Sequence, residues 1–311
     1  VNEGADGGVI ITASHNPGEW NALKLLDKNG EFLNATVGAQ LLKLSESTDV
    51  SFASIEELGN ITVVNDYIDR HIEKILSLPL IDAERIKSQG FHVVIDAVNS
   101  TGGIAIPKLL DRLGVSYKAM YCEPTGNFPH NPEPLEKHLG DLMRSVQEEK
   151  AHFGITVDPD VDRLALVDEK GKMFGEEYTL VACADYVLSK TPGNTVSNLS
   201  STRALKELTL RYHQKYEAAA VGEVNVVQKM KSTHAIIGGE GNGGIIYPEN
   251  HYGRDALVGI ALFLMLLTEK QQPVSVLRAS YPVYFMAKEK IELSISINPD
   301  QILKKLGEKY S

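Results

Sequence analysis

The chain has 311 residues and a net charge of −10, and 43% of its residues are apolar and 23% charged. This composition excludes a general nucleic-acid surface, which needs a basic face, and no apolar run is long enough to cross a bilayer. The length predicts two or three domains of roughly 100 to 150 residues. The two cysteines, Cys122 and Cys183, lack the spacing of a metal site. They indicate a reducing compartment, so we expect a cytoplasmic protein.

Strand-like and helix-like segments alternate along the chain, which predicts an α/β fold built from three similar units. The first unit is predicted to have a strand at 7–13 and helices at 36–47 and 65–78. In the second unit, strands are predicted at 91–103 and 116–122 and a strand pair at 152–171, with helices at 104–114 and 135–150. In the third unit, strands are predicted at 195–201 and 216–222 and a strand-loop-strand at 234–248, with helices at 202–214 and 224–233 and a long helix from Asp255. A strand and a helix are predicted within the tail, 288–311.

The first candidate site follows the β-branched run at 9–11, where Thr12, Ser14 and His15 come directly after the predicted strand. Pro17 prevents continuation as a helix, so we expect Ser14 on a tight loop at the C-terminal end of that strand. Ligands of α/β sheets bind at such ends. The alternative is an ordinary turn without a function.

The second candidate site is the segment TVDPDVDRLALV, in which Asp158, Asp160 and Asp162 alternate between two apolar runs. Their mutual repulsion is costly unless a cation is bound, and an oxygen-only ligand set favours Mg²⁺ first and Ca²⁺ second. Arg163 follows directly and could neutralise the loop or recruit phosphate. An EF-hand is excluded because Arg163 stands where that loop needs glycine. A solvated acidic turn is the remaining alternative.

The third candidate site is a glycine-rich stretch, with five glycines in residues 238–244. Glycine lets the backbone approach a ligand closely, and Glu240 and Asn242 offer acceptors and a donor to sugar hydroxyls. A glycine-rich hairpin without a function is the alternative. Together the three loops contain the groups needed for metal-assisted phosphoryl transfer through a covalent phosphoserine.

The motifs TASHNP, DPDVDR and GEGNGG resemble, in order and separation, those of the α-D-phosphohexomutases, which include phosphoglucomutase, phosphomannomutase and phosphoglucosamine mutase. The segment TGNFPHNPEP also resembles the stretch ahead of that family's metal loop. The resemblance covers essentially the whole chain. It implies a four-domain enzyme whose first three α/β domains surround a central cleft.

This resemblance also implies roles for individual residues. Ser14 would carry the phosphoryl group between the C1 and C6 hydroxyls of a hexose, with a hexose 1,6-bisphosphate as intermediate. Mg²⁺ would be held by Ser14 with Asp158, Asp160 and Asp162. Lys24 would transfer a proton or neutralise charge, His15 would help to position the phosphoserine, and Arg163 is counted among the catalytic residues.

Domain boundaries are expected on the same basis. Residues 1–85 would be the C-terminal part of domain 1, 86–190 domain 2 and 191–283 domain 3. Residues 284–311 would be a linker and the start of a truncated fourth domain. The Arg-, Ser- and Thr-rich phosphate-binding loop expected in that fourth domain is absent from the sequence. We therefore expect the chain as given to bind substrate poorly.

The sugar loops depart from the family pattern. Asn242 and Gly244 stand where many members have serine and histidine, so the usual histidine acid–base candidate has no counterpart, although His251 could substitute. In the other sugar loop, Gly222 and Glu223 resemble the acidic loops of phosphoglucosamine mutases. An acidic residue there favours a substrate with a 2-amino group.

Two other function classes remain open at this point. A metal-dependent phosphohydrolase would use the same serine but let water complete the reaction. A non-catalytic protein would only bind a sugar phosphate or a cation. The expected partners are a hexose phosphate and its 1,6-bisphosphate, with no nucleic acid or membrane, and the protein is expected to be a monomer or homodimer.

Overall fold

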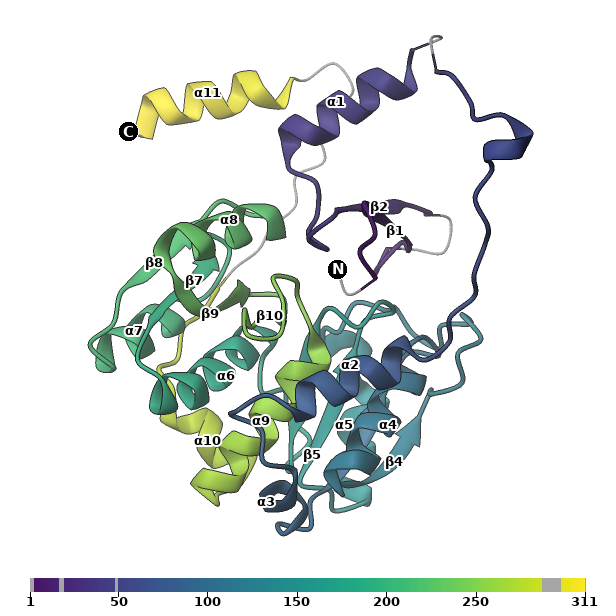
Figure 1. Cartoon of the computed structure of the whole chain (residues 1–311). Helices are drawn as coiled ribbons and strands as arrows, with labels where there is room; N and C mark the ends of the chain where they lie inside the picture. The colour runs from purple at the N-terminus through teal and green to yellow at the C-terminus, as the bar shows by residue number, and fades with distance from the viewer. Residues whose placement is uncertain (1–2, 17–19, 48–49, 287–297, 311) are drawn as a thin grey trace.

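The computed structural model describes residues 3–16, 20–47, 50–286 and 298–310 (Figure 1). Strands in these ranges form one two-stranded and two four-stranded sheets. Each sheet belongs to one of the three predicted α/β units. In the part of the chain that the structure describes, no helix combines the length and the apolar character needed to span a membrane.

The first unit contains a two-stranded sheet. Strand β1 (Gly7–Ile11) pairs antiparallel with β2 (Leu23–Asp27), and α1 (Ala35–Ser45) follows. The Asn34 side chain caps α1 by accepting a hydrogen bond from the backbone of the first turn. The sequence predicts β1 and α1 but not β2, which supplies the partner that β1 needs. A short 3₁₀ turn lies at Ile55–Glu57.

The second unit has the strand order β4-β3-β5-β6. Strand β3 runs parallel to β4 and β5, and β6 is an antiparallel edge strand. Its elements are α2 (Tyr67–Leu76), α3 (Ala83–Lys87), β3 (His92–Asp96), α4 (Gly102–Leu113), β4 (Ser116–Met120), a 3₁₀ turn (Glu136–His138), α5 (Gly140–Glu148), β5 (Phe153–Val157) and β6 (Leu164–Asp168).

The third unit repeats this plan with the order β8-β7-β9-β10. Strand β7 runs parallel to β8 and β9, and β10 is the antiparallel edge strand. Its elements are α6 (Glu176–Lys190), β7 (Asn194–Asn198), α7 (Ala204–Arg211), β8 (Tyr216–Ala219), α8 (Glu223–Thr233), β9 (Ala235–Glu240), β10 (Gly244–Ile246), α9 (Ala256–Lys270) and α10 (Val274–Ser280). The shared strand order confirms that the second and third units are similar.

The structure differs from the predicted elements in two places. The helix predicted at 135–150 is confirmed over Gly140–Glu148, but its first turn is a separate 3₁₀ turn, because buried Leu139 leaves helical geometry at φ −107°, ψ 20°. The long helix α6 is not predicted at all. The strand predicted ahead of residue 298 lies outside the described residues, whereas α11 (Pro299–Tyr310) confirms the helix of the tail.

The two larger units share one hydrophobic core. Helix α9 is buried almost all round and packs against α6 as well as α2, α3 and α4. Phe263 of α9 contacts Phe153 and Phe174 edge-on, at centroid separations of 5.4 and 5.5 Å. Each such buried side chain contributes about 1.5–3 kcal/mol. This core holds the loops at the strand ends of the two units in a defined relation.

Backbone hydrogen bonds join the loop after β5 to the third unit. Leu164 N donates to Gly243 O at 3.0 Å, and Ala256 N donates to Val161 O at 3.1 Å. The β1–β2 hairpin lies above the two larger units in the view of Figure 1. Three loops that the sequence singles out, those after β1, β5 and β9, are thereby brought to one region.

Candidate active site

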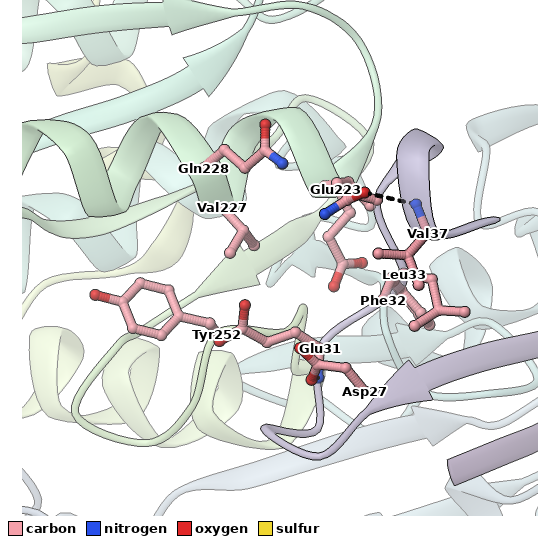
Figure 2. Close-up of a pocket in the computed structure, with 11 residues that line it drawn as sticks. Asp27, Glu31, Phe32, Leu33, Val37, Glu223, Val227, Gln228 and Tyr252 are labelled. Atoms are coloured by element: carbon pink, nitrogen blue, oxygen red, sulfur yellow. Dashed lines mark hydrogen bonds between the residues drawn. The ribbon is translucent and has the colours of Figure 1, made fainter. Parts of the chain in front are cut away.

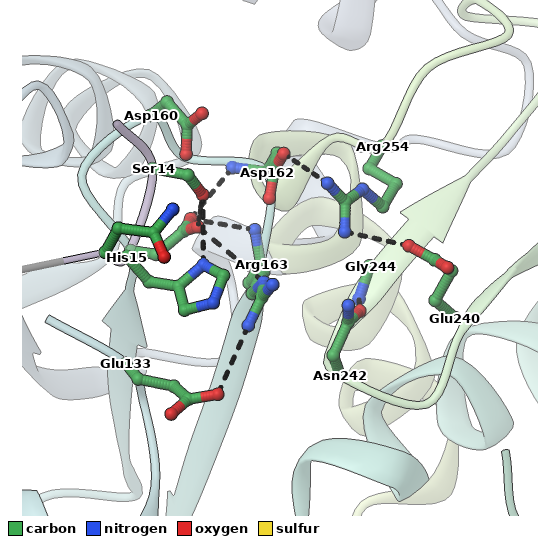
Figure 3. Close-up of polar contacts among 12 residues, drawn as sticks. Ser14, His15, Glu133, Asp160, Asp162, Arg163, Glu240, Asn242, Gly244 and Arg254 are labelled. Atoms are coloured by element: carbon green, nitrogen blue, oxygen red, sulfur yellow. Dashed lines mark hydrogen bonds and ion pairs between the residues drawn. The ribbon is translucent and has the colours of Figure 1, made fainter. Parts of the chain in front are cut away.

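Ser14 lies on the tight loop after β1, as the sequence predicts. Its φ of +51° is in the left-handed region, which a non-glycine residue adopts at a cost of about 1 kcal/mol or more. The backbone N–H of Ser14 donates to Thr12 Oγ1 at 2.9 Å, which stabilises this geometry. The Ser14 hydroxyl donates to Asp158 Oδ2 at 3.2 Å and lies 3.2 Å from Nδ1 of His15 (Figure 3).

Asp158, Asp160 and Asp162 follow β5 and lie together, with one carboxylate oxygen of each within 4.8 Å of the others. Asp158 is completely buried, and its Oδ1 accepts hydrogen bonds from the backbone N–H groups of Asp162 and Arg163. Burial, followed by the charges of Asp162 and Asp160, raises the pKa of Asp158 well above its ordinary value. At Asp160 the outcome is the opposite: although burial opposes it, the hydrogen bond and charge of Lys24 lower the pKa of that carboxyl, so the electrostatic cost of the trio falls mainly on Asp158.

Two buried oxygens of this trio, Asp160 Oδ1 and Asp162 Oδ1, have no hydrogen-bond partner. A buried unpaired carboxylate oxygen is costly unless a cation or a donor satisfies it. Three converging carboxylates with free oxygens and a nearby serine hydroxyl fit the all-oxygen ligand set of a hard divalent cation. The chemistry of the site therefore suits a hard divalent cation such as Mg²⁺ or Ca²⁺.

Lys24 and Arg163 are two of the three basic side chains that border the trio, and the third is Arg254. Lys24 Nζ, from β2, lies 2.6 Å from Asp160 Oδ2 and 3.1 Å from Asp162 Oδ2. Although burial opposes it, the charge of Asp162 and the hydrogen bond to Asp160 raise the pKa of Lys24, so the ammonium stays charged. Arg163 lies between two carboxylates: its Nε is 3.8 Å from Asp158 Oδ2, and its Nη1 is 3.6 Å from Glu133 Oε1.

The side chain of His15 is uncharged near neutral pH. Burial, followed by the charge of Arg163, lowers its pKa below the usual 6.5. A neutral imidazole can accept or donate one hydrogen bond at Nδ1, where the Ser14 hydroxyl lies. His15 can therefore orient that hydroxyl without adding charge to the site.

The predicted sugar-binding residues lie across from Ser14 and the trio. Glu223 begins α8 directly after Gly222, whose φ of +113° is suited to glycine. Glu240 ends β9, and its Oε1 accepts hydrogen bonds from Asn198 Nδ2 at 2.8 Å and Gly222 N at 3.2 Å. Asn242 uses its Oδ1 to accept from the backbone N–H of Gly244 at 3.2 Å.

Arg254 is a site residue that sequence reasoning missed. Its guanidinium forms ion pairs with Asp162 Oδ2 at 2.6 Å, Glu223 Oε2 at 2.8 Å and Glu240 Oε2 at 2.9 Å. Figure 3 shows the side chain between Asp162 and Glu240. The residue carries no motif of its own in HYGRDA, so its role becomes visible only when the three acidic side chains are located in space.

A cavity of about 170 Å³ opens beside these residues. Its lining includes Lys24, Asp160, Glu223, His251 and Arg254. The imidazole Nε2 of His251 is 3.2 Å from Oδ2 of the buried Asp255. This histidine therefore borders the cavity, but its Nε2 contacts Asp255 and not the three aspartates of the loop after β5. A second cavity, of about 120 Å³, lies between the β2 side of the first unit and α8 (Figure 2).

Family models for the three α/β/α domains of phosphoglucomutase/phosphomannomutase match residues 1–50 (domain I), 67–171 (domain II) and 175–284 (domain III). The chain belongs to the phosphoglucomutase/phosphomannomutase family. The matches to domains II and III begin ahead of our boundaries near residues 85 and 190, as do the helices α2 and α6 that are grouped with these units above. The boundaries near residues 85, 190 and 283 stay predictions.

Curated relatives in this family carry different substrate names. The phosphoglucomutase/phosphomannomutase of Thermococcus kodakarensis is 34% identical over 92% of this chain and 62% of its own length. The phosphoglucosamine/phosphogalactosamine mutase of Sulfurisphaera tokodaii is 29% identical over 99% of this chain and 68% of its own length. The chain thus spans roughly two thirds of these relatives.

Solved structures agree on the fold. A phosphoglucomutase/phosphomannomutase family protein from Burkholderia thailandensis matches with a TM-score of 0.77 at 24% identity, covering 88% of this chain and 58% of its own. The N-acetylphosphoglucosamine mutase of Aspergillus fumigatus, in complex with GlcNAc-6P and magnesium, matches with a TM-score of 0.59 at 15% identity, covering 90% of this chain and 74% of its own. At these identities the likeness establishes the fold alone.

Proposed function

We propose that the complete protein is a phosphohexomutase that interconverts hexose 1-phosphate and hexose 6-phosphate. Ser14 would carry the phosphoryl group, and a hexose 1,6-bisphosphate would be the intermediate. The observation that carries this proposal is the 3.2 Å hydrogen bond between Ser14 Oγ and Asp158 Oδ2, from loops 144 residues apart. The names of the relatives support a substrate among glucose, mannose and glucosamine phosphates.

Mg²⁺ is the proposed cofactor, held by Ser14 and the three aspartates. The unpaired buried oxygens of Asp160 and Asp162 support this assignment. When bound, the ion would supply positive charge to the oxygens of the transferring phosphoryl group. The magnesium complex of the Aspergillus fumigatus mutase adds support from the same fold.

The residues of this chain would hold and align the reacting groups. The Ser14 loop presents Oγ to Asp158, and neutral His15 orients it through Nδ1. Lys24, already paired with two carboxylates, would neutralise charge. Arg163 has a buried Nε without a hydrogen-bond partner and would attract a phosphate oxygen.

Gly222, Glu223, Glu240 and Asn242 are the proposed substrate-binding residues. Because Oε1 of Glu240 already accepts two hydrogen bonds, a sugar hydroxyl would share its Oε2 with Arg254, whose Nη1 lies 2.9 Å from that oxygen. Glu223 shares the charge of Arg254, which weakens its attraction for a 2-amino group. The preference for an amino sugar therefore stays a prediction.

The test is Ser14→Ala in the complete protein, with Ser45→Ala on the exposed face of α1 as the control. Ser14→Ala should abolish mutase activity and remove an addition of about 80 Da from the Ser14 peptide, whereas Ser45→Ala should change neither. Release of phosphate without isomerisation would instead indicate the phosphohydrolase. Binding of hexose phosphate without any chemistry would indicate the non-catalytic protein.

The proposed compartment is the cytoplasm, because Cys122 and Cys183 are both free thiols.

A further inference from the structure

Arg254 joins three segments that are distant in the sequence. It lies in the loop between β10 and α9, and its backbone forms an isolated antiparallel bridge with Ile246. Its three guanidinium nitrogens each contact a different carboxylate: Asp162 of the loop after β5, Glu223 at the start of α8 and Glu240 at the end of β9. One rigid, planar group therefore relates the positions of all three loops.

This cluster is buried. The side chain of Arg254 is 10% exposed, and those of Asp162, Glu223 and Glu240 are 12%, 9% and 6% exposed. Buried ion pairs contribute little net stability because desolvation offsets their attraction, but loss of one partner leaves uncompensated charge. An arginine with three buried acidic partners is therefore better explained by the arrangement that it enforces than by stability.

The arrangement has a direct consequence for the candidate metal loop. Asp162 uses Oδ2 for Arg254 and Lys24, and its buried Oδ1 has no partner. The guanidinium thus fixes the rotation of this carboxylate and leaves one oxygen available. The same guanidinium borders the 170 Å³ cavity that Glu223 also lines.

Gly244 makes room for this arginine. A Cβ built at residue 244 would lie 2.3 Å from Cδ and 3.0 Å from Cγ of Arg254, so any other residue must displace the arginine side chain. Figure 3 shows Gly244 beside that side chain. Gly244 and Arg254 are therefore a matched pair. The resemblance to the family predicts a histidine at position 244. The position of Arg254 explains why this chain has a glycine there instead.

We propose that Arg254 is a positioning residue that couples the metal loop to the two acidic loops, so that divalent-cation binding and hexose-phosphate binding depend on each other. A ligand that contacts Glu223 or Glu240 changes the position of the guanidinium, and the guanidinium changes that of Asp162. Such coupling is reciprocal and typically amounts to about 5- to 150-fold in affinity. The inference rests on the proposed function, which supplies the sugar phosphate.

The test measures Mn²⁺ binding to the complete protein by electron paramagnetic resonance, with and without glucose 1,6-bisphosphate. In the wild type the bisphosphate should tighten Mn²⁺ binding at least about fivefold. Arg254→Ala should reduce this factor to about one, and Arg254→Lys should retain part of it. Arg144→Ala, at a surface arginine that is 66% exposed, is the matched control and should behave as the wild type.

Gly244→Ala tests the position of the Arg254 guanidinium rather than its charge. This variant also replaces Arg254→Ala in the experiment if Arg254→Ala does not fold. It should lower the coupling factor although every charge is retained. In the Arg254→Ala background the clash with the arginine is gone and only Asn242 Oδ1, at 3.2 Å, stays close to the added methyl, so the double variant should lower the coupling factor little beyond Arg254→Ala alone. For Arg254→Lys we expect a rise in the KM for hexose phosphate together with a fall in kcat, both larger than in the control.

Two kinds of result would overturn the inference and can be told apart. A wild-type coupling factor of one, an undiminished factor in folded Arg254→Ala or Gly244→Ala, or additive effects in the double variant would refute the role of Arg254 while leaving mutase activity intact. Absence of both mutase activity and Ser14 phosphorylation in the wild type would refute the proposed function, and this inference with it.

Discussion

Asp158→Asn should change the stability of the protein in opposite directions with and without a divalent cation. Asp158 is completely buried among like charges, and its Oδ1 accepts two backbone N–H groups that an asparagine oxygen can also satisfy. The amide would occupy the place of Oδ2, where the Ser14 hydroxyl can turn to accept a hydrogen bond. The substitution thus removes charge with little change of shape.

The magnitude follows from the separations in the trio. Charges within 4.8 Å repel by about 3.5 kcal/mol per pair at an effective dielectric constant of about 20, and Asp158 takes part in two of the three pairs. Lys24, Arg163 and Arg254 offset most of this repulsion. We expect Asp158→Asn to raise the free energy of unfolding by about 1–2 kcal/mol when metal is chelated.

The assay is urea unfolding in EDTA and in Mg²⁺ at 100 times its Kd. The wild type should gain about 2.7 kcal/mol from the ion, and Asp158→Asn should gain almost none. Asp168→Asn is the control, because Asp168 is buried in the same unit but accepts hydrogen bonds from the turn at Lys170 and Lys172 instead. A variant that is less stable in EDTA, or equally stabilised by Mg²⁺, would refute this reasoning.

Two further predictions concern basic groups. Lys24→Met removes an ammonium that competes with a cation for two carboxylates. Titration with Mn²⁺ should therefore show an affinity that is unchanged or increased up to about tenfold, while kcat falls by about 10²-fold or more. Weaker Mn²⁺ binding would contradict this prediction. Although burial opposes it, the hydrogen bond and charge of Asp255 raise the pKa of His71. Burial also opposes the shift at Asp255, but hydrogen bonds from His251 and His71 lower the pKa of that carboxyl. The His71–Asp255 pair therefore stabilises the fold between about pH 4 and 6.5 and loses strength as the pH rises through the folded-state pKa of His71. His71→Gln should cost about 1 kcal/mol in urea unfolding at pH 6 and less at pH 9, and an equal cost at both pH values would argue against the pair.

Local pattern was enough to predict most elements and the positions of three loops. A β-branched run followed by proline located the Ser14 turn, and alternating aspartates between apolar runs located the loop after β5. By contrast, α6 was missed because residues 178–188 are buried on every side of the helix, the polar Thr179 and Asp185 included, so it lacks the periodicity of an amphipathic helix. Strand β2 was missed because it has only a few apolar residues, and these do not predict a strand until its pairing with β1 is known.

The candidate site shows the same division. Ser14 and the three aspartates could be proposed from motifs because each motif is contiguous in the sequence. Arg254 could not, because its significance depends on three carboxylates contributed by separate segments. The engagement of Glu240 by Asn198 and Arg254 was likewise invisible, since it arises only when β7 and β9 pair and the loop before α9 folds over them.

The most direct measurement is a crystal structure of the complete protein soaked in Mn²⁺, with the ion located by anomalous scattering. Our account predicts one peak within about 2.5 Å of an oxygen of each of Asp158, Asp160 and Asp162 and of the Ser14 oxygen or a phosphate carried on it. A peak that contacts the aspartates but lies beyond reach of Ser14, or no peak at this loop at saturating Mn²⁺, would contradict it.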